Sequence, residues 1–110
     1  MRSRHLARLE SQIAASDAGE DRDALVAERV SYLARLGQID QARDELRALR
    51  AGLTSARSPR VSVLAHIADG LCHYYANMGV EAKDRFLRAH AVARATGLDA
   101  LVARSASWLA

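Results

Sequence analysis

The sequence has few of the residues that make disulfides, tight turns and backbone breaks. Its 110 residues include one cysteine, Cys72, one proline and six glycines. A single cysteine excludes an intrachain disulfide framework and is typical of a reducing compartment, so we expect a cytoplasmic protein. So few prolines and glycines do not support a turn-rich all-β fold. The length is enough for one domain with a modest core.

Long apolar runs and blocks of one charge are also missing. The most apolar stretch, 61–78, is interrupted by His66, Asp69, His73 and Asn77, and the basic start is followed by charged residues. The sequence therefore predicts neither a membrane span nor a signal peptide. The 16 basic residues exceed the 13 acidic ones by only three and are interspersed with them. Because nucleic-acid binders usually carry a clustered basic face, we do not expect a nucleic-acid partner.

Apolar residues recur at spacings of three and four along the chain, which indicates amphipathic helices. Ser58–Pro59 predicts a helix start, and the glycines at 37, 79 and 97 predict helix ends. The main loop is expected at 52–57. The other connections are short, so neighbouring helices should pack antiparallel. Six helices are expected, with apolar stripes that include Leu6 to Ile13, Leu25 to Leu36, Ile39 to Leu53, Leu64 to Met78, Ala82 to Ala93 and Leu98 to Leu109.

Parts of the sequence repeat one another. Tyr32–Gly37 aligns with Tyr74–Gly79, and Trp108–Ala110 begins the same motif a third time. The helices that follow the first two copies also align, because Ala42–Leu46 matches Ala82–Phe86. The similarity predicts a chain of helical hairpins.

This pattern resembles the tetratricopeptide (TPR) repeat, a helical hairpin of about 34 residues. Gly37 and Gly79 match the turn glycine of that family. Ala42 with Leu46, and Ala82 with Phe86, match the alanine and the bulky residue of its second helix. The family's early Trp is replaced by Val26 and Ala68, and its closing Pro is missing. The chain is therefore identified as a divergent tetratricopeptide-like repeat protein.

The resemblance implies an all-α fold in which antiparallel hairpins stack as a short α-solenoid of about six helices. A single domain, 1–110, would contain a half repeat at 1–16, hairpins at 22–53 and 59–97, and the first helix of a further repeat at 98–110. The alternative is a plain helical bundle. Because the last helix lacks its partner, we expect a fragment of a longer chain, or a homodimer formed through the C-terminal helix.

In this family the first helix of each hairpin lines a concave groove, where peptides bind. The resemblance places a polar stripe there, with Arg35 as the charged neighbour that could pair with a carboxylate. The stripe consists of His66, Asp69, His73 and Asn77. The equivalent positions in the adjoining helices are mostly small: Ala24, Ala27 and Ser31, and Ala100, Ala103 and Ser107. The alternative for the stripe is an ordinary solvated helix face, and binding at Arg43, Arg47 and Arg50 would instead indicate the outer, convex side.

The residue patterns do not predict catalysis. His66 and His73 are seven residues apart, about 10 Å along a helix, which is too far for one metal ion. Cys72 is expected to be a small core residue. Ser62 and His66 form an i,i+4 pair, but no strained nucleophile elbow or phosphate loop accompanies them. We therefore expect no enzyme activity, no metal site and no cofactor.

The predicted function is that of a protein–protein interaction module, a scaffold that presents a concave groove to a peptide or partner domain. The alternative is a regulatory input region of a bacterial signalling protein, of the diguanylate cyclase or transcription regulator type. An RNA-binding helical repeat is a third hypothesis, and salt-dependent binding would identify it.

Overall fold

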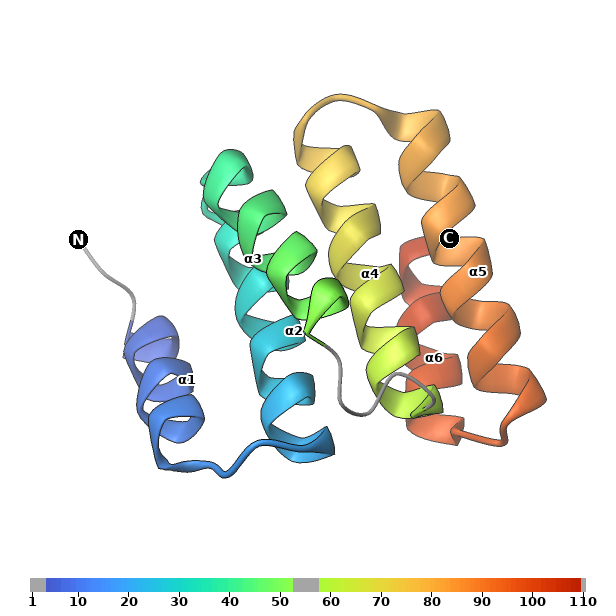
Figure 1. Ribbon diagram of the computed structural model, residues 1–110. Helices are drawn as coiled ribbons and strands as arrows, with labels where there is room; N and C mark the ends of the chain where they lie inside the picture. Colours follow the sequence, from blue (N-terminus) through green and yellow to red (C-terminus); the bar gives the residue numbers. More distant parts are fainter. Residues whose placement is uncertain (1–3, 53–57, 110) are drawn as a thin grey trace.

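The regular structure of the protein is helical throughout the part that can be described. The computed structural model describes residues 4–52 and 58–109 and contains no strand in these ranges. Its helices are α1 (Arg4–Ala15), α2 (Glu20–Arg35), α3 (Ile39–Ala51), α4 (Pro59–Tyr75), α5 (Gly79–Ala95) and α6 (Asp99–Leu109) (Figure 1). The prediction of an all-α fold with six helices is confirmed for these residues. Leu53, which was expected to end the third stripe, and most of the 52–57 loop lie outside them.

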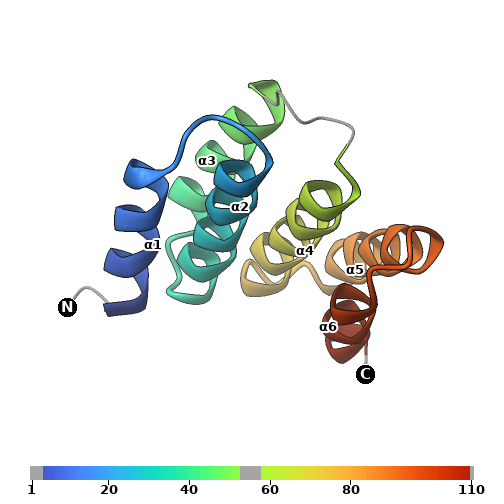
Figure 2. The same ribbon diagram turned by 90° about the horizontal axis from the view of Figure 1, so that it is seen from below.

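Successive helices run antiparallel (Figure 1). Each helix packs against the next one in the sequence, and α4 also packs against α2 and α6. Figure 2 shows α1, α2, α4 and α5 following one another in a row, with α3 on one side of this row and α6 on the opposite side. None of the helices in the described ranges combines the length and the apolar character needed to cross a membrane.

The helices recur at a nearly constant interval. The helices α2, α4 and α6 begin at positions 20, 59 and 99, and α3 and α5 begin at positions 39 and 79. This interval is longer than the unit of about 34 residues that is typical of the tetratricopeptide repeat. The sequence match of Ala42–Leu46 with Ala82–Phe86 agrees with this interval, because it has the same offset as the starts of α3 and α5.

The turns confirm the interval and correct one expectation. Gly37, Asn77 and Gly97 follow α2, α4 and α5 with left-handed backbones, at φ values of 83°, 62° and 71°. The next residue donates a backbone hydrogen bond to the carbonyl five positions earlier in each case, at 2.8–3.0 Å. This is the bond that closes a helix end with a left-handed residue. The predicted match of Gly37 with Gly79 is therefore wrong by two residues. Asn77 occupies the turn, since asparagine tolerates this conformation, and Gly79 is the first residue of α5.

The core runs along the row of helices, and α4 contributes more buried residues to it than any other helix. Leu46 and Phe86 are both buried, at equivalent positions of α3 and α5. Cys72 is buried as predicted, and burial, followed by the nearby Asp69 charge, raises the pKa of its thiol to about 11. Three residues expected in the apolar stripes, Leu36, Tyr74 and Met78, are exposed instead, because they lie at or just beyond the ends of their helices.

The start of α4 is closed by a side-chain cap. Ser58 has an extended backbone, and its Oγ accepts a hydrogen bond of 3.3 Å from the backbone N–H of Val61. Ser58 Oγ also donates to the carboxylate of Glu20 at the start of α2. We expect Ser58→Ala to lower the free energy of unfolding by about 1 kcal/mol, because a helix N–H loses its partner. Urea unfolding measures this value, and Ser58→Thr, which keeps a hydroxyl cap, should retain most of the stability.

Candidate functional site

Asp69 is the centre of an ionic network on the polar stripe of α4. Its side chain is only 13% exposed. Arg50 of α3 donates to Asp69 Oδ2 at 3.1 Å, and Arg85 of α5 donates to the same oxygen at 3.2 Å. His73 Nδ1 lies 3.1 Å from the other carboxylate oxygen. Arg50, Asp69 and Arg85 are called the Asp69 triad below, and they tie three helices together.

His66 lies on the same side of α4 without a hydrogen bond to its Nδ1 atom within the described ranges. Burial lowers the pKa of its imidazole, and the Arg50 charge lowers it further, while Asp69 acts in the opposite direction. The ring is therefore neutral at neutral pH, since the ordinary histidine pKa is already about 6.5. A neutral, half-buried imidazole with an unpaired nitrogen is a polar contact point rather than a charged one.

The Asp69 triad has a counterpart one repeat earlier, with every charge reversed. Arg29 of α2 lies 3.5 Å from Glu10 of α1 and 3.5 Å from Glu45 of α3. The three pairs of positions, 10 and 50, 29 and 69, and 45 and 85, share one offset. Asp69 therefore corresponds to Arg29, and not to Ala27 as the alignment of Gly37 with Gly79 had it.

The expected open groove of small residues is wrong for α2. Ala24, Ala27 and Ser31 are buried, and the two alanines belong to the hydrophobic core. Arg35 is exposed, but it lines a different hollow from the one that contains Asp69 and His73. Asn77 lies in the turn after α4 instead of on the helix. The structure thus brings together His66, Asp69 and His73, and separates them from Arg35.

A groove rich in arginine lies beside the Asp69 triad, between α3 and α4. It measures about 290 Å³. We call it the arginine groove; it is lined by Arg43, Leu46, Arg47, Arg50, Asp69 and His73. The three arginines that were expected on a separate convex face therefore share one groove with two residues of the polar stripe.

A second hollow, of about 260 Å³, lies on the opposite side of α4. Leu71 of α4 lines it; two residues along a helix correspond to a rotation of about 200°, so Leu71 faces away from Asp69 and His73. The other walls come from α1, α2 and α6, and we call this site the α2–α6 hollow. Its walls include Glu28, Ser31, Tyr32, Arg35, Arg104, Ser107 and Trp108.

Ionic and aromatic contacts hold α6 at the edge of this hollow. Both terminal nitrogens of Arg104 donate to the carboxylate of Glu28 on α2, one of them at 3.0 Å. These hydrogen bonds raise the pKa of the Arg104 guanidinium. The ring of Trp108 stacks on Phe86 of α5, with centroids 5.6 Å apart and planes 17° from parallel. The hollow is therefore bounded by side chains with fixed partners.

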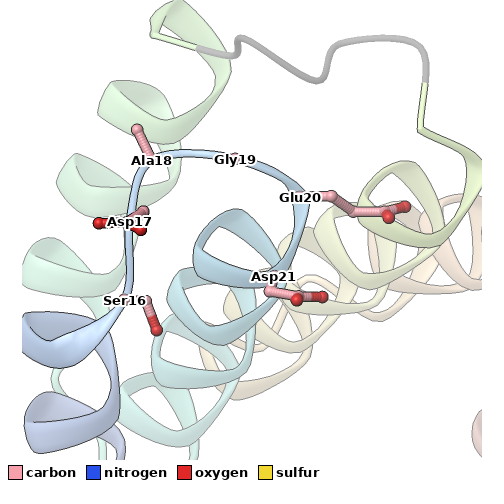
Figure 3. Close-up of a pocket in the computed structure, with 6 residues that line it drawn as sticks. All are labelled: Ser16, Asp17, Ala18, Gly19, Glu20 and Asp21. Atoms are coloured by element: carbon pink, nitrogen blue, oxygen red, sulfur yellow. The ribbon is translucent and has the colours of Figure 1, made fainter.

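The loop between α1 and α2 forms a third concavity, lined by residues 16–21 (Figure 3). The carboxylates of Glu20 and Asp21 point to one side of the view, and that of Asp17 points to the other (Figure 3). Glu20 is engaged by Ser58, and Asp21 accepts a hydrogen bond of 2.9 Å from Arg60. In the described ranges, no three His, Cys, Asp or Glu side chains are grouped to hold a metal ion. Glu20 and Asp21 therefore tie the start of α2 to the start of α4.

Comparison with protein-family models, with curated proteins and with solved structures gives no match. The candidate site therefore rests on geometry alone. Sequence reasoning placed Arg35, Ser31 and Ser107 at the expected groove but missed the other walls of the α2–α6 hollow. A usable signal was present, because Glu28, Tyr32 and Arg35 follow each other at spacings of four and three on one face of α2.

Proposed function

We propose that this chain is a cytoplasmic protein-interaction module, and that its α2–α6 hollow binds a peptide segment of a partner protein. The proposal depends on one observation: a hollow between non-adjacent helices combines aromatic rings with an arginine that has no acidic partner among the described residues. Within the described part of the chain, Arg35 forms no ion pair. A partner carboxylate could accept two hydrogen bonds from its guanidinium.

The other walls suit an apolar side chain beside that carboxylate. Tyr32 and Trp108 lie on two sides of the hollow, and Leu71 is on the third. Aromatic side chains are enriched at the centres of protein interfaces because they bury a large area and lose little conformational freedom. The expected ligand is thus a short segment with an apolar residue next to an acidic one.

The size of the hollow favours a peptide anchor over a free small molecule. Its volume of about 260 Å³ lies below the range of about 300–1,000 Å³ that is typical of small-molecule sites. A single side chain and its flanking backbone would fill it. A regulatory input region could use the same hollow, with the peptide supplied by an output domain, so this alternative differs in the partner and not in the site.

The helix contacts support the tetratricopeptide-like part of the proposal. In such a stack, the first helix of each hairpin packs on the first helices beside it and on the second helix of the preceding hairpin. The contacts of α4 with α2, α6 and α3 have this pattern. In this interpretation the α2–α6 hollow lies on the concave side, where the first helices α2, α4 and α6 meet.

Selection from a display library of random peptides tests the function. The unmodified protein should enrich sequences with an acidic residue next to an aromatic or aliphatic one. Arg35→Glu should lose these peptides, because their carboxylate then faces a like charge.

Arg94→Glu is the matched control, since it makes the same charge change at an exposed arginine of α5 that lines neither this hollow nor the arginine groove, and it should retain the selected peptides. Equal binding by both variants and the unmodified protein would exclude the hollow as the peptide site. Circular dichroism of both variants excludes unfolding as the cause of any loss.

A further inference from the structure

The arginine groove carries positive charge that the described residues do not balance. Arg43 forms no ion pair within residues 4–52 and 58–109, and its guanidinium donates a hydrogen bond of 3.8 Å to the sulfur of Met78. Arg47 pairs with Asp44 at 3.4 Å, but their side chains are 79% and 73% exposed. An exposed pair of this kind contributes little stability and is easily exchanged for another partner. Two guanidinium groups at this groove are thus available for an external anion.

The single carboxylate among the groove's lining residues is already neutralised. Asp69 is shared by Arg50 and Arg85, so its charge is not free to compensate Arg43 and Arg47. On α5, Arg85 and Arg88 both bind Asp84, at 2.7 Å and 3.1 Å. On this surface of α3, α4 and α5 the arginines therefore outnumber the aspartates. The arginines are Arg43, Arg47, Arg50, Arg85 and Arg88, and the aspartates are Asp44, Asp69 and Asp84.

We propose that the arginine groove docks an acidic segment of a second protein, separately from the peptide in the α2–α6 hollow. Arg43, Arg47 and Arg50 are spaced by four and three residues, so they form one row of about 10 Å along α3. A partner helix with carboxylates at i, i+4 and i+7 has the same spacing. Arginine suits this role because its planar guanidinium pairs with a carboxylate through two parallel hydrogen bonds.

The groove favours a protein partner over a nucleic acid. A phosphate backbone carries charge of one sign at regular short intervals, and here it would pass the carboxylates of Asp44, Asp69 and Asp84. The lining residues include no Phe, Tyr or Trp on which a base could stack. An acidic peptide, by contrast, can place its carboxylates opposite the arginines and neutral residues opposite the aspartates.

Fluorescence anisotropy with a designed peptide tests the proposal. The probe is a short fluorescein-labelled helical peptide with glutamates at i, i+4 and i+7 and leucines beside them. We expect binding that weakens as salt is added, and an increase of about tenfold or more in Kd for the double variant Arg43→Ala/Arg47→Ala, since losing one charge-assisted contact is worth about that factor.

Three controls make the outcome decisive. The same peptide with glutamine in place of glutamate should not bind. Arg94→Ala, at an exposed arginine in the last turn of α5 that does not line the groove, should change Kd by less than twofold. Arg35→Glu should also leave this Kd unchanged, which separates this proposal from that for the hollow. Binding of the glutamine peptide, equal weakening by Arg94→Ala, or tighter binding of a single-stranded DNA of equal charge would overturn it.

Discussion

Replacing Phe86 with alanine is expected to lower the free energy of unfolding by about 3–5 kcal/mol, the usual cost of removing a buried aromatic ring. Phe86 is buried, packs against α4 at Gly70 and stacks on Trp108 of α6. Its ring therefore joins three helices, and the protein has few other aromatic side chains to fill the space. The cavity left by alanine would loosen α6 as well as α5.

Chemical unfolding of the purified protein measures this loss. The control is Leu87→Ala, the adjacent residue on α5, whose side chain is 49% exposed. Substitutions at such surface positions usually change stability by less than about 1 kcal/mol. A similar loss for both variants would show that α5 does not present Phe86 to the core.

Gly70→Ala is expected to lower the free energy of unfolding by about 1–3 kcal/mol, the usual cost of overpacking a core. A Cβ atom at position 70 would lie 2.4 Å from Cε1 of Phe86, closer than two carbon atoms can approach. Alanine is the better helix former by about 1 kcal/mol, so the glycine in the middle of α4 is explained by the close approach of the ring.

The sign of this effect should reverse when the ring is removed. In a Phe86→Ala background, Gly70→Ala no longer meets the ring and should stabilise the protein by up to about 1 kcal/mol, through helix propensity alone. Four unfolding curves complete this double-mutant cycle. If Gly70→Ala lowered the stability equally in both backgrounds, a clash with the Phe86 ring would not be the cause of its cost.

The helices could be predicted from the sequence because amphipathic stripes are local. The spacings of three and four residues located all six helices, and Ser58–Pro59 located the start of α4. The contact between Gly70 and Phe86 could not be found in this way. It depends on how one ring is oriented between α4 and α5, which no spacing along a single helix specifies.

The candidate site was displaced by an error of two residues. The sequence register matched Gly37 with Gly79, but the left-handed turn residue after α4 is Asn77. A shift of two positions rotates a helix face by about 200°. The stripe of Asp69 and His73 was therefore expected on the side of the first helices, whereas it contacts α3 and α5. Glycine is the commoner residue at such turns, so Gly79 was the more obvious choice in the sequence.

The register that matches Gly37 with Asn77 also relates two walls of the α2–α6 hollow. It matches Ser31 of α2 with Leu71 of α4, and both residues line the hollow. The charge-reversed triads follow the same offset, although opposite charges at equivalent positions hide the repeat from any comparison of residue types. The protein thus has two candidate surfaces on opposite sides of α4: the α2–α6 hollow with its aromatic walls, and the arginine groove.

The most direct test of the proposed function is to map the binding site of a library-selected peptide by amide chemical shifts in the ¹⁵N-labelled protein. Binding in the α2–α6 hollow predicts the largest changes at Tyr32, Arg35 and Leu71 and at the indole N–H of Trp108, with little change at Leu46 and Asp69. Changes centred on Leu46 and Asp69, or spread evenly over the protein, would contradict it.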